Sequence, residues 1–179
     1  KEIEHILMFY DYDNPEFTIN DIAIHGVDIV RFITGLGIKD ANNMGAAMAP
    51  AAFATIKAHF SDLHTGPQDF DLIVTGDLGQ LGADLLLQLA RDEGISLGGK
   101  LTDCGTMVFD MQSQDVHSGG SGCGCSAIVL CSELLHKLRS GKLKKILFCG
   151  TGALLSPTST QQSLPIPGIC HAVCITGGR

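Results

Sequence analysis

The stretch at residues 69–94, DFDLIVTGDLGQLGADLLLQLARDEG, decides the fold class of this chain. Its first part is a short apolar run that ends at Gly76 and Asp77, which predicts a buried strand followed by a turn. The second part repeats leucine at helical spacing, at positions 81, 85, 86 and 89. Asp77 with Gln80 three residues later resembles a capping box at the start of that helix. A strand, a turn and a helix in direct succession indicate an α/β protein.

Strands and helices continue to alternate on both sides of this stretch. The patterns predict strands at 22–33, 144–153 and 169–175, a helix that starts near Pro50, and a weaker strand or loop at 100–110. A further helix follows residue 125 and ends at Gly141, with an apolar face made of Ile128, Cys131, Leu134, Leu135 and Leu138. We therefore expect one α/β domain at residues 37–179, with a mixed sheet layered between helices, after a poorly placed segment at 1–36.

Composition excludes several classes of protein. The 179 residues are 45% apolar and only 17% charged, which is typical of a globular chain. The net charge is −7 and no basic cluster exceeds Lys142, Lys144 and Lys145, so nucleic acid is not an expected partner. No apolar run reaches the ~18 residues that a bilayer span needs. We expect a protein that is soluble or peripheral to a membrane.

The cysteines favour neither a disulfide framework nor a metal site. Their number, seven, is odd, and several lie near or inside predicted regular elements, which fits a reduced setting. Cys123 and Cys125 form a C-x-C pair, and no second pair stands at the spacing of a zinc finger or ribbon. The sequence therefore predicts no metal and no cofactor.

A glycine-rich loop, SGGSG at residues 118–122, precedes the helix predicted after residue 125. Glycines let the backbone approach a ligand, and free N–H groups at a helix N-terminus favour an anion. The loop lacks the lysine of a phosphate-binding G-x4-G-K-[ST] loop. The same glycines could instead allow close packing of the helix on its neighbours, and the pattern leaves both interpretations open.

Several single residues also have two interpretations each. His117 could be an acid/base group or a hydrogen-bonded loop residue. Asp77, at the carboxyl end of a strand, could line a ligand site or only cap a helix. Cys123 and Cys125 could be nucleophiles at a helix N-terminus or buried small apolar residues. Ser156 could offer a hydroxyl to a pocket or to its own loop.

Several long motifs resemble the stage V sporulation protein AD family, whose fold is similar to that of thiolases and ketoacyl synthases. They are MGAAMAPAA at 44–52, DFDLIVTGDLGQLG at 69–82, DCGTMVFD at 103–110, QDVHSGGSGCGCSAIVL at 114–130 and GTGALLSPTSTQQ at 150–162. The resemblance covers residues 37–175. It implies the C-terminal one of two similar α/β halves, of βαβαβαββ type.

The resemblance also implies that condensing chemistry has lapsed. In thiolase-like enzymes the nucleophilic cysteine belongs to the N-terminal half. The C-terminal half normally supplies a histidine and a further histidine or asparagine from two turns. The matching turns here, at 75–79 and 117–121, lack a P-H-Q-A-N, G-N-T-S or G-H-P pattern. A working acyltransferase remains the alternative, with Cys123 or Cys104 as its nucleophile.

The family role implied is a non-enzymatic component of the SpoVA system that binds dipicolinate (pyridine-2,6-dicarboxylate) for uptake into the developing spore. That role implies a place in the forespore or spore, soluble or peripheral to the inner membrane. The implied partners are other SpoVA membrane proteins and a second copy paired through the sheet. The expected ligand-binding residues are Asp77, His117, Gly119, Gly120, Ser121 and Ser156.

Overall fold

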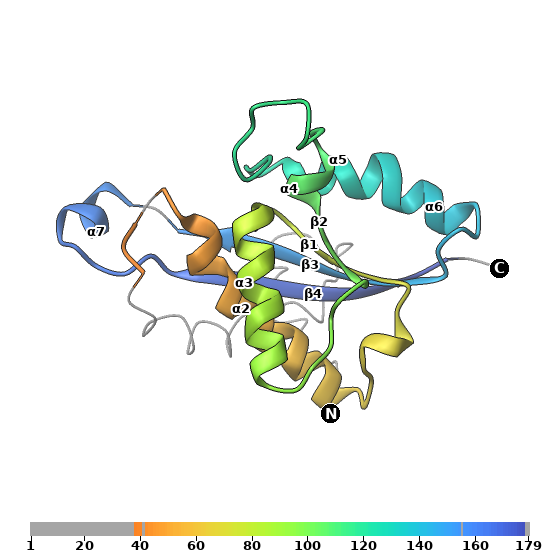
Figure 1. The fold of residues 1–179 in the computed structure, drawn as a ribbon. Coiled ribbons are helices and arrows are strands. Elements are labelled where there is room, and N and C mark those ends of the chain that lie inside the picture. Colours follow the sequence, from red (N-terminus) through yellow and green to blue (C-terminus); the bar gives the residue numbers. More distant parts are fainter. Residues whose placement is uncertain (1–37, 41, 155, 178–179) are drawn as a thin grey trace, which may run out of the picture.

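The computed structural model describes residues 38–40, 42–154 and 156–177, and it has a mixed α/β architecture (Figure 1). Four strands form one sheet in the order β2-β1-β3-β4. Strands β1 (Leu72–Thr75), β2 (Leu101–Asp103) and β3 (Lys145–Ala153) are parallel, whereas β4 (Gly168–Thr176) runs antiparallel to β3. The expected fold class is confirmed. The segment 1–36 and the strand expected at 22–33 lie outside the described residues.

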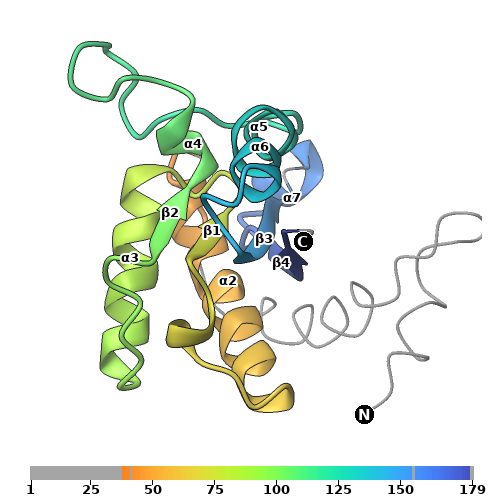
Figure 2. The ribbon, with the colours of Figure 1, turned by 90° about the vertical axis from the view of Figure 1, so that its right-hand side faces the viewer.

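Helices cover both faces of the sheet (Figure 2). Helices α2 (Met44–Asp62) and α3 (Gly79–Asp92) lie on one face. The other face carries a continuous helical segment made of α5 (Cys125–Val129), the π-helix η4 (Leu130–Leu134) and α6 (Leu135–Arg139). The sheet therefore lies between two helical layers, as the buried strands predict.

Alternation along the strands supplies both cores. In β1 and β3, Ile73 and Leu147 pack toward α2 and α3, whereas Val74 and Ile146 pack toward α5 and α6. All four side chains are fully buried. Because successive residues of a strand point to opposite faces, these short apolar runs can fill two cores at once.

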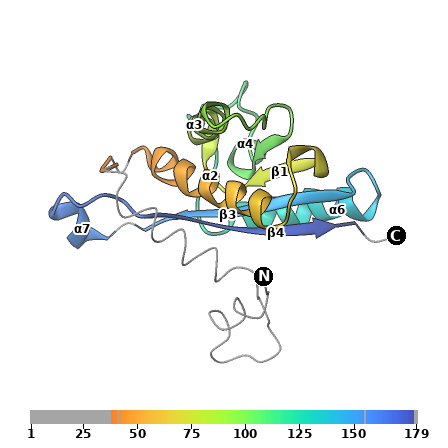
Figure 3. The ribbon, with the colours of Figure 1, turned by 90° about the horizontal axis from the view of Figure 1, so that it is seen from below.

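Short elements connect the layers. The 3-10 helix η3 (Pro67–Asp69) precedes β1, and α4 (Cys104–Met107) follows β2 directly. Strands β3 and β4 form a long antiparallel pair that extends past the other strands, with α7 (Pro157–Gln161) at its far end (Figure 3). The loop that joins α4 to α5 lies at the carboxyl ends of β1 and β2.

Helix α2 begins earlier than expected. Pro50 lies inside the helix, and the helix starts at Met44 with Asn43 as its N-cap. The Asn43 side chain accepts a hydrogen bond from the Ala46 N–H at 3.1 Å. Proline in a helix interior removes one backbone hydrogen bond. Here the small buried residues on both sides of it pack against the sheet and offset that loss.

The apolar face of the segment 125–139 also differs from the prediction. Ile128 is 63% exposed and Cys131 is exposed, whereas the buried positions are Cys125, Val129, Leu134 and Leu138. Their spacing of four, five and four residues contains one extra residue, and the five-residue step falls in the π-helix. One inserted residue turns the buried face by about 100°. A strict 3.6-residue pattern that correctly places Leu134 and Leu138 in the core therefore assigns the wrong side chains before the π-helix.

Candidate functional site

A pocket of about 170 Å³ opens where the start of α2 meets the turn after β1 and the glycine loop. Three segments line it: residues 42–45 with Met48 from α2, residues 77–79 with Leu81 from the β1–α3 region, and residues 118–121 from the glycine loop. Ligand sites of open α/β sheets lie at this edge of the sheet. The volume is below the ~300–1,000 Å³ of sites for drug-sized molecules, which favours a small ligand.

Four of the six expected site residues line this pocket. They are Asp77, Gly119, Gly120 and Ser121. The other two are not among the lining residues. The side chain of His117 is 93% exposed, with Nδ1 at 3.8 Å from an oxygen of the equally exposed Asp115. Ser156 lies beyond β3, immediately before α7.

Asp77 joins three segments rather than capping α3. Its Oδ1 accepts a hydrogen bond from the Thr151 hydroxyl at 2.9 Å. Its Oδ2 accepts from the Ser121 hydroxyl at 3.0 Å and from the Gly122 N–H at 3.2 Å. The expected capping box is wrong, because α3 has Leu78 as its N-cap and no side-chain cap hydrogen bond. Three donors around the carboxylate offset part of its charge at the pocket.

The glycine loop uses its glycines for close packing. The N–H groups of Gly119 and Gly120 donate to the carbonyls of Val116 at 2.9 Å and Gly105 at 2.7 Å. A Cβ added at Gly119, where φ is +113°, would lie 2.6 Å from the Gly105 carbonyl oxygen. With the Gly122 N–H bound to Asp77, these three backbone donors are engaged within the fold. The loop therefore shapes the pocket without offering those donors to a ligand.

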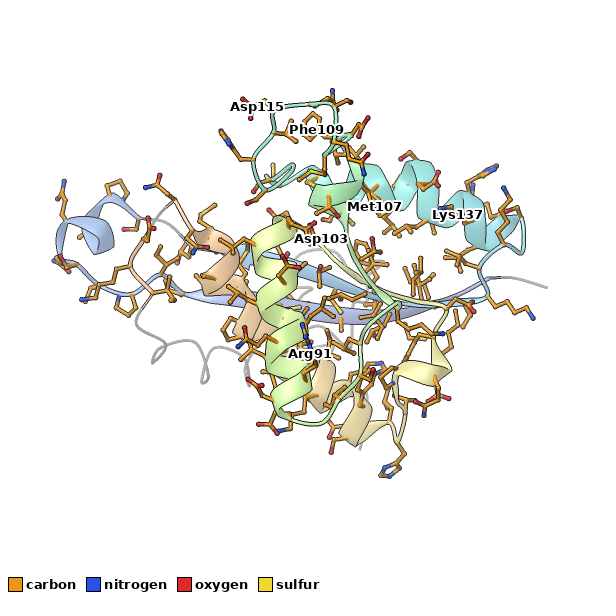
Figure 4. The ribbon with its side chains drawn as sticks, in the orientation of Figure 1. Arg91, Asp103, Met107, Phe109, Asp115 and Lys137 are labelled. Carbon is orange, nitrogen blue, oxygen red and sulfur yellow. The ribbon has the colours of Figure 1, made fainter. Side chains whose placement is uncertain are left out.

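Asp103 is a central residue that the sequence interpretation did not identify. Its carboxylate is 1% exposed and accepts four hydrogen bonds of 2.7–3.0 Å, from the Thr75 hydroxyl and from the N–H groups of Leu78, Gly79 and Gly105. Burial raises the pKa of Asp103 above its usual range, whereas these hydrogen bonds act to lower it. Figure 4 labels Asp103 beside the first turn of α3. The carboxylate thereby fixes the turns that follow β1 and β2.

The start of α2 forms the opposite wall and was also missed. Asn42, Asn43, Met44 and Gly45 all line the pocket. The first N–H groups of any α-helix have no partner within the helix, and they favour an anion. Asn43 engages only the Ala46 N–H among them, so the amides of Met44 and Gly45 stay without an intrahelical acceptor. Two asparagines before a run of helix formers are the N-cap signal that could have found this wall.

The thiols near the pocket differ in access. Cys104 is fully buried, and burial is the main cause that raises its pKa to about 12. Cys125 is buried as well, with a pKa raised by burial and by the carboxylate of Asp77. Cys123 is exposed. Within the described ranges, no group of three or more histidine, cysteine, aspartate or glutamate side chains could hold a metal ion.

Comparisons with known proteins agree with the sequence motifs. The model of the stage V sporulation protein AD family matches residues 18–176. Stage V sporulation protein AD of Bacillus subtilis (strain 168) is 45% identical over 156 residues, which are 87% of this chain and 46% of that protein. The chain therefore spans less than half the length of this curated relative.

A solved structure also resembles the chain. It is 3-oxoacyl-[acyl-carrier-protein] synthase III from Aquifex aeolicus VF5, with 18% identity and a TM-score of 0.41 over 72% of this chain and 38% of that one.

Among the described helices, none is long and apolar enough to cross a bilayer.

Proposed function

The chain belongs to the stage V sporulation protein AD family, and from this premise we propose that it is a non-enzymatic dipicolinate-binding component of the SpoVA system. In this role it takes part in dipicolinate uptake into the developing spore. Because the chain spans 46% of its curated relative, the role is proposed for the whole protein, with the pocket on this part of it.

The observation that carries the proposal is the pocket between α2 and the glycine loop. Its α2 wall offers the first-turn amides of Met44 and Gly45 to a carboxylate, and Asn42 adds an uncharged polar side chain beside them. Ser121 and the Asp77 turn line the opposite side. A small planar dianion suits such a site, since dipoles and neutral donors can hold it without a bound metal.

Charge also favours local recognition over long-range attraction. A chain with net charge −7 repels a dianion at a distance, so the binding free energy has to come from short-range donors. Asp77 is compatible with such a ligand because its carboxylate already accepts three hydrogen bonds. One of its oxygens, Oδ1, accepts its hydrogen bond from Thr151 on β3 and not from the glycine loop.

Acyl transfer remains a separate hypothesis. It needs a thiolate, and Cys104 is a poor source because it is buried and its pKa is raised to about 12. Cys123 is exposed but is not among the residues that line the pocket. No described feature favours this chemistry over ligand binding.

Family membership gives a sporulation context, and two finer statements extend it. We propose that the protein acts in the forespore or spore, peripheral to the inner membrane, where it contacts other SpoVA membrane proteins. We also propose that copies of the chain self-associate through the sheet, of which β4 forms one edge among the described strands. Light scattering of the purified chain at several concentrations tests self-association.

The first experiment is a calorimetric titration of dipicolinate into this chain and into a full-length family protein. Isophthalate, the same dicarboxylate without the ring nitrogen, is the control. We expect saturable binding to both proteins, tighter for dipicolinate than for isophthalate. Binding only to the full-length protein would overturn the assignment of a sufficient pocket to this chain. Absence of binding to both would overturn the proposed function.

A further inference from the structure

The two walls of the pocket differ in chemistry. Residues 118–121 and 77–79 present peptide groups, the hydroxyls of Ser118 and Ser121, and the carboxylate of Asp77. The same pocket is also lined by Met44, Met48 and Leu81, which supply apolar side chains from two different helices. Met44 and Met48 are four residues apart on α2, so they lie on the same side of that helix, one turn from each other.

A close helix crossing brings these three side chains together. A Cβ added at Gly45 would lie 2.5 Å from the Leu78 carbonyl oxygen and 3.1 Å from the Gly82 Cα. The backbones of α2 and α3 can touch here only because Gly45 and Gly82 have no side chain. Leu81, immediately before Gly82, is therefore held next to the first turn of α2.

Burial separates the roles of Met48 and Leu81, while Met44 is partly buried against the same core as Met48. Met48 is 2% exposed and belongs to the core that α2 shares with the sheet, so it forms the inner part of the wall. Leu81 is 46% exposed at the rim, where packing within the fold does not require a large apolar side chain. Thioethers and leucine pack well on the face of an aromatic ring, and sulfur–ring contacts are favourable.

We infer that Met44, Met48 and Leu81 are specificity-determining residues that pack on the ring face of a flat aromatic dicarboxylate. The inference rests on the proposed function. It adds the feature of the ligand that these residues recognise, which is its aromatic ring. The ring lies against the apolar wall, while the carboxylates reach the α2 amides and the polar side of the pocket. Ligands that carry the same carboxylates without a ring then lose only the contribution of this wall.

The test compares three ligands on the whole 179-residue chain and on three variants. Dipicolinate and isophthalate carry an aromatic ring. Glutarate places the same number of atoms between its two carboxylates but has no ring, and its affinity is measured by competition against dipicolinate. The variants are Leu81→Ala, the volume-conserving Met48→Leu, and the matched control Leu63→Ala. Leu63 is 59% exposed at the other end of α2.

We expect Leu81→Ala to lower the affinity for dipicolinate and for isophthalate about fivefold each, while the affinity for glutarate changes less than about twofold. Met48→Leu should keep the fold and lower the preference for a ring by a smaller factor, because it removes sulfur but little volume. Leu63→Ala should leave all three affinities unchanged.

Two results would overturn the inference in distinguishable ways. If Leu81→Ala weakens the binding of all three ligands equally, or of none of them, while dipicolinate still binds the unsubstituted chain, the apolar residues do not recognise the ring. If dipicolinate binds neither the unsubstituted chain nor the full-length family protein, the proposed function fails, and the inference that rests on it fails as well. If dipicolinate binds only the full-length protein, the same substitutions are compared there, with the same results for and against the inference.

Discussion

The glycine loop and the first turn of α2 are two walls of one pocket, and they use their backbones in opposite ways. In the loop, the N–H groups of Gly119, Gly120 and Gly122 are all engaged by acceptors within the fold. At the start of α2, the amides of Met44 and Gly45 have no acceptor within their helix. The glycine-rich wall therefore shapes the pocket, and the α2 wall holds the donors that we propose for the anionic ligand.

Carboxylates strengthen this contrast. Asp77 and Asp103 both tie the loop side of the pocket together, Asp77 through Ser121 and Gly122 and Asp103 through the turns after β1 and β2. On the α2 side, Asn43 provides the cap with a neutral amide. The loop side thus carries two carboxylates, whereas the described carboxylate beside the start of α2 is Asp40, which accepts a hydrogen bond from the Asn42 N–H at 2.9 Å.

Removal of the Asp103 carboxylate should have the largest effect. In Asp103→Ala, four buried donors lose their acceptor at once. We expect the free energy of unfolding to fall by about 3–5 kcal/mol, even though the substitution also removes a charge that is costly to bury. Urea denaturation followed by circular dichroism measures this change.

Asp110→Ala is the matched control for that experiment. Asp110 also accepts hydrogen bonds, from the Gln112 N–H at 3.0 Å and from the Ser113 hydroxyl, but it lies exposed on the loop after α4. Its loss should change stability by less than about 1 kcal/mol. Equal losses in the two variants would mean that Asp103 is no more important than an ordinary loop carboxylate.

A pair of glycine substitutions tests whether the loop acts by packing. Gly119 and Gly122 have nearly the same φ, +113° and +111°, so alanine is strained by about 1–3 kcal/mol at either position. A Cβ at Gly122 meets nothing within 4 Å, whereas one at Gly119 meets the backbone of Gly105. We expect Gly119→Ala to cost about 1–3 kcal/mol more than Gly122→Ala in chemical denaturation.

The strained backbone is common to both variants, so only their difference reports on packing. If Gly122→Ala proved as destabilising as Gly119→Ala, the close approach to Gly105 would have no energetic weight. The loop's conformation alone would then explain its glycines.

The sequence predicted the layered α/β fold because buried strands carry a local signal. The runs around Ile73 and Leu147 are apolar, short and bounded by turns, and both form strands where expected. The face of the segment 125–139 was predicted correctly at Leu134 and Leu138 but wrongly at Ile128 and Cys131, because a π-helical turn changes the phase of the helix without a mark in the sequence. Periodicity assumes a constant helix, so such insertions escape it.

The candidate site was predicted only in part for a related reason. Asp77 and the glycine loop stand out as single residues and motifs, and both do line the pocket. Asp103 became central through four contacts, among them Thr75 and Leu78, which are distant in the sequence. Such long-range convergence depends on the register of β1 with β2, which no local pattern specifies.

A charge added to the α2 wall should affect binding more than stability. Aspartate is as good an N-cap as asparagine, so Asn43→Asp should keep the free energy of unfolding within about 0.5 kcal/mol. The new carboxylate lies beside the open amides, and we expect it to weaken dipicolinate roughly tenfold at low salt. Calorimetry at two salt concentrations should show a smaller effect at the higher one.

Gln88→Glu is the control for this variant, because it adds the same charge at an exposed position of α3 that does not line the pocket. It should leave the affinity nearly unchanged. Similar losses in Asn43→Asp and Gln88→Glu would point to the overall charge of the chain, and the α2 wall would lose its assigned role.

Thiol alkylation should sharpen the comparison without changing stability. Cys104 lies under the loop side of the pocket, fully buried and with its pKa raised to about 12, so very little of its thiolate exists at neutral pH. Cys123 lies exposed at the end of the loop. Mass spectrometry after brief iodoacetamide treatment of the folded chain should find Cys123 modified and Cys104 intact. In 8 M urea both should react. Rapid alkylation of Cys104 in the folded chain at pH 7 would show an activated nucleophile beside the pocket, and it would favour acyl transfer over ligand binding.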